Sequence, residues 1–149
     1  MIFGRRSILP ELTLSFCLGW LATTEYVDAQ TFTTLYMFNG LNYANGSGPT
    51  GSLAAGSNGV LYGTTQFGGA YTQCPQGASQ GCGTVYSLTP PASPGGVWTE
   101  TVLWSFGGTP SDTYYPYGGV TLGSGGVLYG TGGYGGYCGA VFSLTPPAS

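Results

Sequence analysis

The stretch GVLYGT, at Gly59–Thr64, recurs unchanged at Gly126–Thr131. A second stretch, CGTVYSLTPPAS at Cys82–Ser93, matches CGAVFSLTPPAS at Cys138–Ser149 in ten of twelve positions. The copies are 67 residues apart for the first stretch and 56 for the second, so the first copy carries an 11-residue insertion near residues 70–80. Such self-similarity is typical of repeat architectures, in which each unit buries its apolar surface against the next.

A third pair of stretches sets the limits of the two repeats. Thr33–Phe38 (TTLYMF) is similar to Thr101–Phe106 (TVLWSF) at a separation of 68 residues. We therefore expect a single domain over residues 30–149. Its first repeat covers about residues 31–98, and a truncated second repeat covers about 99–149.

Each repeat has the pattern of short β-strands. Runs of β-branched and aromatic residues are bounded by Asn-Gly or Gly-Gly, which are hairpin signals, and the Pro-Pro pairs end a strand because proline cannot donate to the ladder. No helical apolar stripe occurs after the first 29 residues, so we expect an all-β protein. The expected strands are 31–38, 51–55, 60–64, 84–89, 98–106, 118–122, 127–131 and 140–145.

Four short antiparallel strands per unit indicate a β-propeller-like tandem repeat, with about two copies. Gly63 and Gly130 lie inside expected strands, which predicts that a backbone or a large ring approaches there. Strict alternation would place Val102, Trp104 and Phe106 on one face of their strand.

The second unit lacks a fourth strand of its own, and Thr31–Phe38 is a lone strand of that type. Two units cannot close a propeller ring, because closed propellers use about four to eight. Three alternatives remain open: a fragment of a longer array, a homo-oligomer that shares strands, and a compact two-sheet sandwich.

The first 29 residues resemble a secretory signal peptide. Arg5 and Arg6 precede an apolar stretch from Ile8 to Ala22, and Val27–Ala29 offers small residues before a cleavage point. We therefore expect a secreted or cell-surface protein. The alternative is an uncleaved membrane anchor, but the apolar stretch is shorter than the roughly 20 residues of a transmembrane helix and contains Glu11. No membrane span is expected after the leader is removed.

The composition excludes several classes of function. Charged residues make up 5% of the chain, there is no His, and Lys and Arg together number two. Nucleic-acid binding needs a basic surface, and His-dependent catalysis or metal ligation needs His. After the leader, Glu100 and Asp112 are the only charged side chains. We expect Glu100 to be solvated and Asp112 to cap a turn, and we expect no catalytic residue, metal or cofactor.

The cysteines suit an exported chain. Cys74 and Cys82 flank the inserted loop, and a disulfide between them is the leading expectation. Cys138 is the repeat equivalent of Cys82. Three roles stay open for it: a buried small side chain, an intermolecular thiol, or the partner of Cys82.

Loop tyrosines are the candidate binding surface. Tyrosine rings among hydroxyls and amides can stack on sugar faces without charge, although they can equally well pack between units. The candidates are Tyr71, Tyr114, Tyr115, Tyr117, Tyr134 and Tyr137.

The motifs resemble those of a known family. LYGTT followed by Gly68–Gly69, then GTVYSLTPP, then a strand ending WSFGG at Gly108, is similar to the GloVer (Gloeobacter–Verrucomicrobium) tandem repeats of secreted bacterial proteins. The resemblance covers Thr33 to Ser149 and implies an exported, propeller-like repeat array with no established catalytic activity.

From these observations we expect a non-enzymatic structural, adhesive or binding module whose partner is a polysaccharide or cell-wall glycan. Further repeats or a homo-oligomer would complete the array. An exported hydrolase or lyase and a self-assembling extracellular scaffold are the alternatives.

Overall fold

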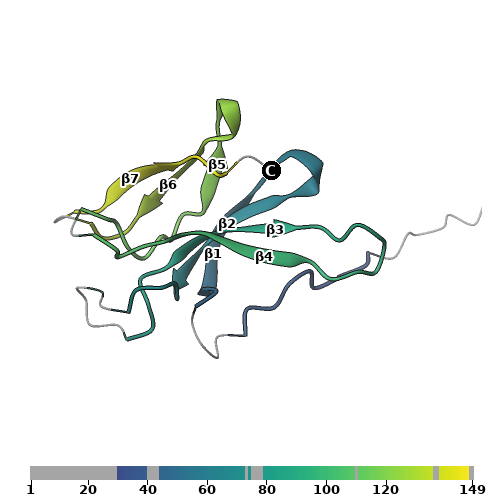
Figure 1. The fold of residues 1–149 in the computed structure, drawn as a ribbon, viewed down its shortest axis with the longest axis horizontal. Helices are drawn as coiled ribbons and strands as arrows, with labels where there is room; N and C mark the ends of the chain where they lie inside the picture. Colours follow the sequence, from purple (N-terminus) through teal and green to yellow (C-terminus); the bar gives the residue numbers. More distant parts are fainter. Residues whose placement is uncertain are drawn as a thin grey trace, which may run out of the picture. The chain divides into compact units, whose positions relative to one another are not determined.

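The chain forms two antiparallel sheets, which Figure 1 shows as separate groups of strands. The computed structural model describes residues 30–39, 44–72, 74, 79–109, 111–135 and 138–147. In the described residues the protein is all-β, with no α-helix, and neither sheet is closed or curled. The expected leader, residues 1–29, lies outside the described part of the chain.

The first sheet has four strands in chain order and the second has three. The first contains β1 (Ser47–Ala55), β2 (Leu61–Phe67), β3 (Thr84–Thr89) and β4 (Thr99–Ser105). The second contains β5 (Val120–Leu122), β6 (Leu128–Gly132) and β7 (Ala140–Leu144). Seven of the expected strands are thereby confirmed, with ends that differ by a few residues.

The two repeats fold alike. In the first, Ala54 pairs with Tyr62, and in the second the equivalent Thr121 pairs with Tyr129. Each hairpin turns through a single 3₁₀ turn, η1 (Ser57–Gly59) or η2 (Ser124–Gly126). Before each turn a glycine donates its N–H to a valine carbonyl at 2.8 Å, Gly56 to Val60 and Gly123 to Val127. The sequence repeat is therefore a structural repeat.

The glycines inside the strands make room for rings, as expected. Gly63 pairs with Tyr86, and a Cβ at Gly63 would lie 2.5 Å from the Tyr86 hydroxyl. Gly130 pairs with Phe142, and a Cβ there would collide with the Phe142 ring. The same glycine-under-ring arrangement thus occurs in both sheets.

Cross-strand pairing divides each sheet into two faces, which we name by their residues. The leading face carries Leu61, Gly63, Tyr86 and Leu88 in the first sheet and Leu128, Gly130, Phe142 and Leu144 in the second. The trailing face carries Tyr62, Thr64, Val85 and Ser87 in the first sheet and Tyr129, Thr131, Val141 and Ser143 in the second.

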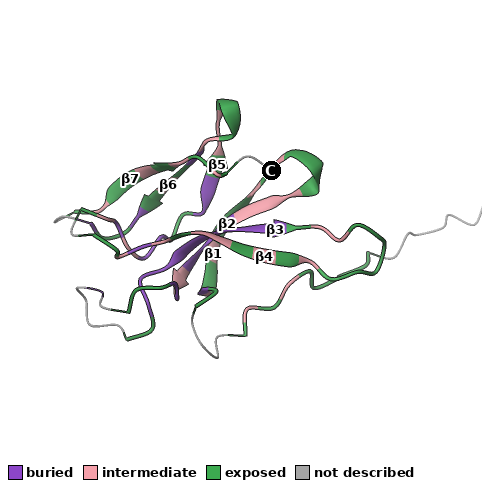
Figure 2. Cartoon of the chain, viewed as in Figure 1, coloured by how far each residue is buried: buried purple, intermediate pink, exposed green. Residues whose placement is uncertain are grey.

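The core lies where the trailing face of the first sheet meets the leading face of the second. Val85 and Leu128 are fully buried there, and Tyr62, Phe142 and Leu144 pack against them. Figure 2 shows the result: β3 is buried along most of its length, whereas β7 has no buried residue.

The connection from Phe106 to Gly119 ties the two sheets together. The N–H of Phe106 donates to Gly83, and that of Tyr115 donates to Cys82 at 2.9 Å. The Phe106 ring meets that of Phe142 in the second sheet at 5.1 Å between centroids. The two units therefore share one core.

The expected strand at 31–38 is wrong. Residues Thr33–Asn39 belong to no ladder, and Leu35, Tyr36 and Phe38 lie beside the leading face of the first sheet instead. Phe38 makes an edge-to-face contact with Tyr86, with 5.0 Å between ring centroids. The physical reason is that the apolar side chains of the segment pack on the face of the sheet instead of extending its strand ladder.

The expected alternation along β4 is also wrong. Val85 pairs with Trp104 but Tyr86 pairs with Val102, so Leu103 is an extra residue in a β-bulge. The bulge therefore puts Val102 on the face of Tyr86 and Trp104 on the opposite face, with Val85. Trp104 is 46% exposed and Phe106 is 1% exposed.

The structure contains no transmembrane helix in its described part, since no helix there is long and apolar enough to cross a bilayer.

Candidate functional site

Two exposed aromatic rings flank a shallow hollow beside β4. The hollow measures about 320 Å³ and is lined by Tyr71, Trp104, Ser105, Thr109 and four smaller or aliphatic neighbours. Tyr71 is 45% exposed and Trp104 46% exposed. No charged side chain lines the hollow, so its chemistry is that of rings, hydroxyls and backbone.

The expected disulfide holds the loop that carries Tyr71. Cys74 and Cys82 are bonded, with their Cα atoms 5.6 Å apart, and both are buried. A Cβ on Gly107 would meet the Cys82 sulfur, and a Cβ on Gly108 would lie 2.8 Å from the Tyr71 ring. The two glycines after β4 therefore let the disulfide and the Tyr71 ring pack directly on the backbone.

Asp112 fixes that glycine turn, as expected. Its Oδ2 accepts hydrogen bonds from the N–H groups of Gly107 at 3.0 Å and Gly108 at 3.2 Å, and its Oδ1 accepts one from Thr113 at 3.0 Å. Bonds from neutral donors to a carboxylate are stronger than bonds between neutral groups. The carboxylate is thus used to shape the backbone under Tyr71.

Three of the candidate tyrosines pack on one another. Tyr114 stacks on Tyr134 with 5.9 Å between centroids and 4° between planes, and Tyr115 meets both edge-on. Tyr115 is 4% exposed, whereas Tyr134 is 41% exposed. In this cluster Tyr115 is part of the hydrophobic core, and Tyr134 is exposed to solvent.

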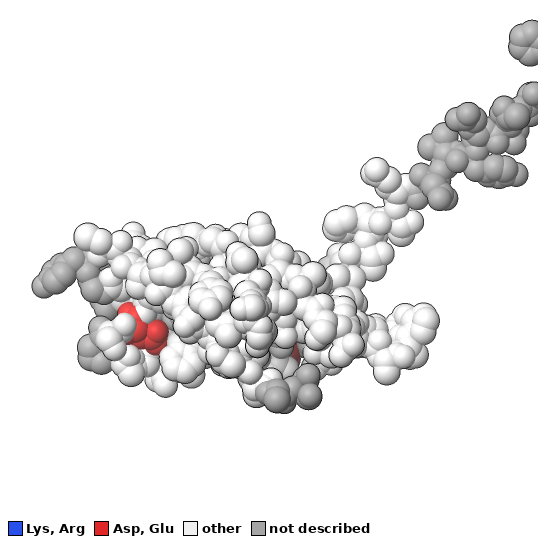
Figure 3. All heavy atoms as spheres, turned by 90° about the horizontal axis from the view of Figure 1, so that it is seen from above, with Lys and Arg blue, Asp and Glu red and all other residues white. Residues whose placement is uncertain are grey.

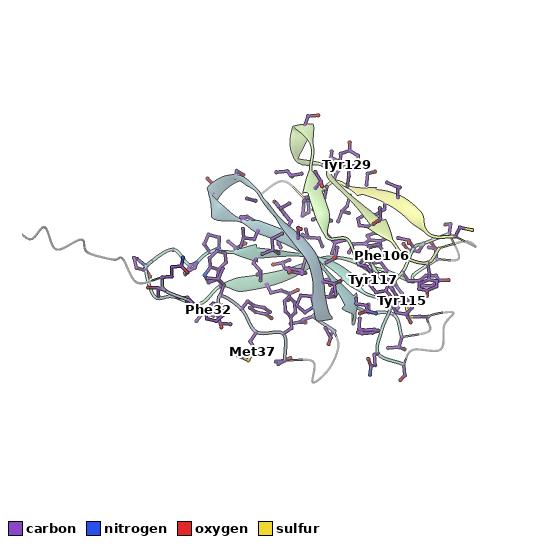
Figure 4. The ribbon with its side chains drawn as sticks, turned by 180° about the vertical axis from the view of Figure 1, so that it is seen from behind. Phe32, Met37, Phe106, Tyr115, Tyr117 and Tyr129 are labelled. Carbon is purple, nitrogen blue, oxygen red and sulfur yellow. A yellow bond between two sulfur atoms is a disulfide. The ribbon has the colours of Figure 1, made fainter. Side chains whose placement is uncertain are left out.

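The Tyr117 ring packs on Gly133, next to that cluster, and Figure 4 labels Tyr117 and Tyr115. Tyr117 is 47% exposed, and its hydroxyl accepts a hydrogen bond from the Gln66 side-chain amide at 3.2 Å. Tyr137 lies outside the described residues.

A larger hollow of about 520 Å³ opens at the ends of the two sheets. Its walls hold Tyr62, Asn58 and hydroxyl side chains together with the proline pairs Pro90–Pro91 and Pro146–Pro147. No charged residue lines it. Each repeat contributes one of the two matching proline pairs, so the hollow lies between equivalent parts of the two repeats.

Glu100 is not the solvated side chain that the sequence predicts. It pairs with Leu88 and so shares the leading face with Tyr86. Its Oε1 is buried and has no hydrogen-bond partner among the described residues. Desolvation by burial raises the pKa of Glu100 to about 7. Burial, and then the charge of Glu100, raise the pKa of Tyr86. Neither hollow described above includes Glu100.

The surface has almost no charge. Figure 3 shows it nearly uncoloured, with two separate acidic spots. Within the described part of the chain, the acidic residues are Glu100 on β4 and Asp112 in its turn, and no group of three metal-ligand side chains occurs. Cys138 is exposed and free, so it is neither a buried small side chain nor the partner of Cys82.

Sequence reasoning missed Trp104 as a site residue. Strict alternation places Trp104 on the same face as the buried Phe106, and the sequence gives no sign that the surroundings of that face differ between the two positions. The nearest signal in the sequence is Gly107–Gly108, just after Phe106, because such glycines mark a place where another group approaches the backbone, as the Tyr71 ring does.

No family model, no curated protein and no solved structure matches this chain.

Proposed function

We propose that this protein is a secreted or cell-surface, non-enzymatic binding module that recognises a neutral glycan through Tyr71 and Trp104. The observation that carries the proposal is a pair of exposed rings across an uncharged hollow that also holds two hydroxyl side chains. Trp104 comes from β4, and Tyr71 comes from the loop that the disulfide anchors. Rigid aromatic platforms with a few polar groups suit a ligand that has an apolar face and hydroxyl edges.

The site is built before any ligand arrives. The Cys74–Cys82 bond, the Asp112 hydrogen bonds and the packing of Tyr71 on Gly108 all restrain the ring. Preorganisation of this kind lowers the entropic cost of binding. The disulfide and the basic-apolar-small leader sequence support export, and the resemblance to GloVer repeats supports the same location.

We further propose that the two sheets are successive units of a propeller-like array. Each unit has the same hairpin, the same turn and the same glycine-under-ring pair, and the second unit packs its leading face on the trailing face of the first. Stacked units of this type leave binding surfaces in loops at their ends.

Titration with a panel of neutral oligosaccharides, followed by NMR or calorimetry, tests the binding proposal. Tyr71→Ala and Trp104→Ala should each weaken binding by about tenfold or more, since a well-placed ring contact contributes about 1.4 kcal/mol or more. The matched control is Tyr129→Ala, which removes an equally exposed ring (48%) from the second sheet. Equal losses in all three variants, or no binding to any neutral glycan, would refute the proposal.

A further inference from the structure

The outer edge of β7 is an open strand edge whose counterpart in the first sheet is occupied. In the first sheet β3 is paired on both sides, by β2 and β4. In the second sheet β7 pairs with β6, and among the described residues nothing pairs with its other edge. Unpaired edges are templates for the addition of another strand.

The chain contains a segment of the type that this edge takes in the first sheet. Thr33–Phe38 is the repeat equivalent of Thr101–Phe106, which includes most of β4. It belongs to no ladder, and none of the loop hydrogen bonds found among the described residues involves it. Its apolar side chains are poorly covered: Leu35 is 42% exposed and Met37 76% exposed, and Figure 4 shows Met37 on this segment.

We propose that copies of this chain assemble head to tail, with Thr33–Phe38 of one copy pairing with the free edge of β7 in the next. The proposal rests on the unit-on-unit stacking proposed above. The new contact would repeat, between chains, the arrangement that β4 and the second sheet already have within one chain.

The connecting segments have matching lengths. Within the chain, Phe106 lies 14 residues before Val120, the first residue of β5. Phe38 lies 15 residues before Leu53, which is the repeat equivalent of Val120 in β1. A copy whose Thr33–Phe38 is paired with the neighbour's β7 can therefore place its own first sheet where the next unit of the neighbour would stand.

The faces that would meet are also available. Release of Thr33–Phe38 uncovers the leading face of the first sheet, where Leu61, Tyr86 and Leu88 lie beneath it. The trailing face of the second sheet is already bare, with Tyr129 48% exposed and Val141 78% exposed. In the single chain, these two kinds of face form the core. The contact between copies is heterologous, so it gives a ring or an open filament. Rings of about two to four copies would contain the four to eight units of closed propellers.

The pairing register can be transferred from β3 and β4. Val85 opposes Trp104 and Ser87 opposes Thr101, so Val141 should oppose Tyr36, and Ser143 should oppose Thr33. Directly opposed residues have Cβ atoms about 4.5–5.5 Å apart, near enough for a disulfide after small adjustments.

Cysteine cross-linking tests this register in the full chain with Cys138→Ser as background. One variant carries Tyr36→Cys and another carries Val141→Cys, and mixing them should give a disulfide-linked heterodimer on non-reducing gels. Thr33→Cys with Val141→Cys, which is out of register, should cross-link at least tenfold less. A single chain with both Tyr36→Cys and Val141→Cys that cross-links within a monomer would overturn the proposal.

Light scattering across concentrations gives a second readout. The parent chain should form discrete species of about two to four copies, or filaments. Thr34→Pro should weaken assembly at least tenfold relative to Thr34→Ala, because proline is poorly tolerated inside a strand. Thr34 is exposed and outside any ladder, so the melting temperature of the monomer should be the same in both variants. A parent chain that stays monomeric at every concentration would also refute the proposal. Glycan binding by Tyr71 and Trp104 is scored separately, so either proposal can fail alone.

Discussion

The third strands of the two sheets, β3 and β7, have nearly the same sequence, but β3 is mostly buried and β7 is mostly exposed. Val85 in β3 is fully buried, and its equivalent Val141 in β7 is 78% exposed. Cys82 is buried and bonded, and its equivalent Cys138 is exposed and free. The backbone pattern is therefore set by the local sequence, whereas burial is set by which units flank the strand.

The difference follows from stacking. The trailing face of the first sheet is covered by the second sheet, and the same face of the second sheet is bare. In stacked repeats each unit is stabilised by its own folding and by the interface with its neighbour. Substitutions at equivalent positions of the two units should thus have unequal effects.

The largest contrast is expected at the equivalent cysteines. Replacing both Cys74 and Cys82 with Ser removes a bond between residues eight apart and leaves hydroxyls in the core. The free energy of unfolding should fall by about 3 kcal/mol. Cys138→Ser, at an exposed position, should change it by less than about 0.5 kcal/mol. Chemical denaturation of the two proteins measures the contrast, and equal losses would show that the two positions have equal surroundings.

The valine pair should give the next largest contrast. Val85→Ala opens space in the core between the sheets and should cost about 2 kcal/mol of unfolding free energy. Val141→Ala removes an exposed side chain and should cost less than about 0.5 kcal/mol in the monomer. Thermal unfolding at low protein concentration is the measurement. A large cost for Val141→Ala that appears only at high concentration would instead report assembly through this face.

The sequence predicted the elements that depend on local chemistry. β3 ends at Thr89, just before the Pro-Pro pair. Gly63 and Gly130 lie under aromatic rings because a residue without a side chain leaves room for a ring above it. The disulfide followed from the spacing and the expected compartment.

What the sequence did not predict depends on partners outside the local segment. Thr33–Phe38 has strand composition, but in the structure its rings pack on a sheet face and it pairs with no strand. The bulge at Leu103 puts Val102 and Trp104 on opposite faces, and bulges leave only weak signals in sequence. The sequence predicts a solvated Glu100 because strand alternation indicates on which face of the sheet a side chain lies, but it does not indicate which other segments cover that face.

Glu100 should make the stability of the chain depend on pH. Its pKa is raised to about 7 in the folded chain from an ordinary value near 4.5, so the folded state holds the proton more tightly. Stability should therefore be greatest below about pH 4.5, should fall as the pH rises toward 7, and should then level off. Glu100 stays partly open to solvent, so we expect a loss of about 1 kcal/mol, less than the shift alone would give.

Glu100→Gln should remove most of that pH dependence and should be more stable than the parent at pH 8. Melting curves between pH 4 and pH 8 show whether it does. Asp112→Asn is the matched control: it should lower stability through the Gly107 turn while keeping the decline toward pH 7. A parent chain whose stability rises between pH 5 and pH 7 would contradict the assignment of Glu100 to a buried site.

The smallest contrast is expected at the two hairpin turns, where the middle residue has left-handed backbone angles. Asn58 has φ of 55° in η1, and Gly125 has φ of 71° in η2. Asn tolerates this conformation better than other side chains do, and glycine adopts it freely. Gly125→Ala meets no neighbouring atom within 4 Å, so its cost should be backbone strain alone, about 1 kcal/mol. Gly125→Asn should cost about half of that or less, because it recreates the residue of the first turn. Differential scanning calorimetry resolves the two. An alanine that costs no more than the asparagine would mean that the second turn leaves its left-handed conformation, and that the two repeats are less alike than their hydrogen bonds indicate.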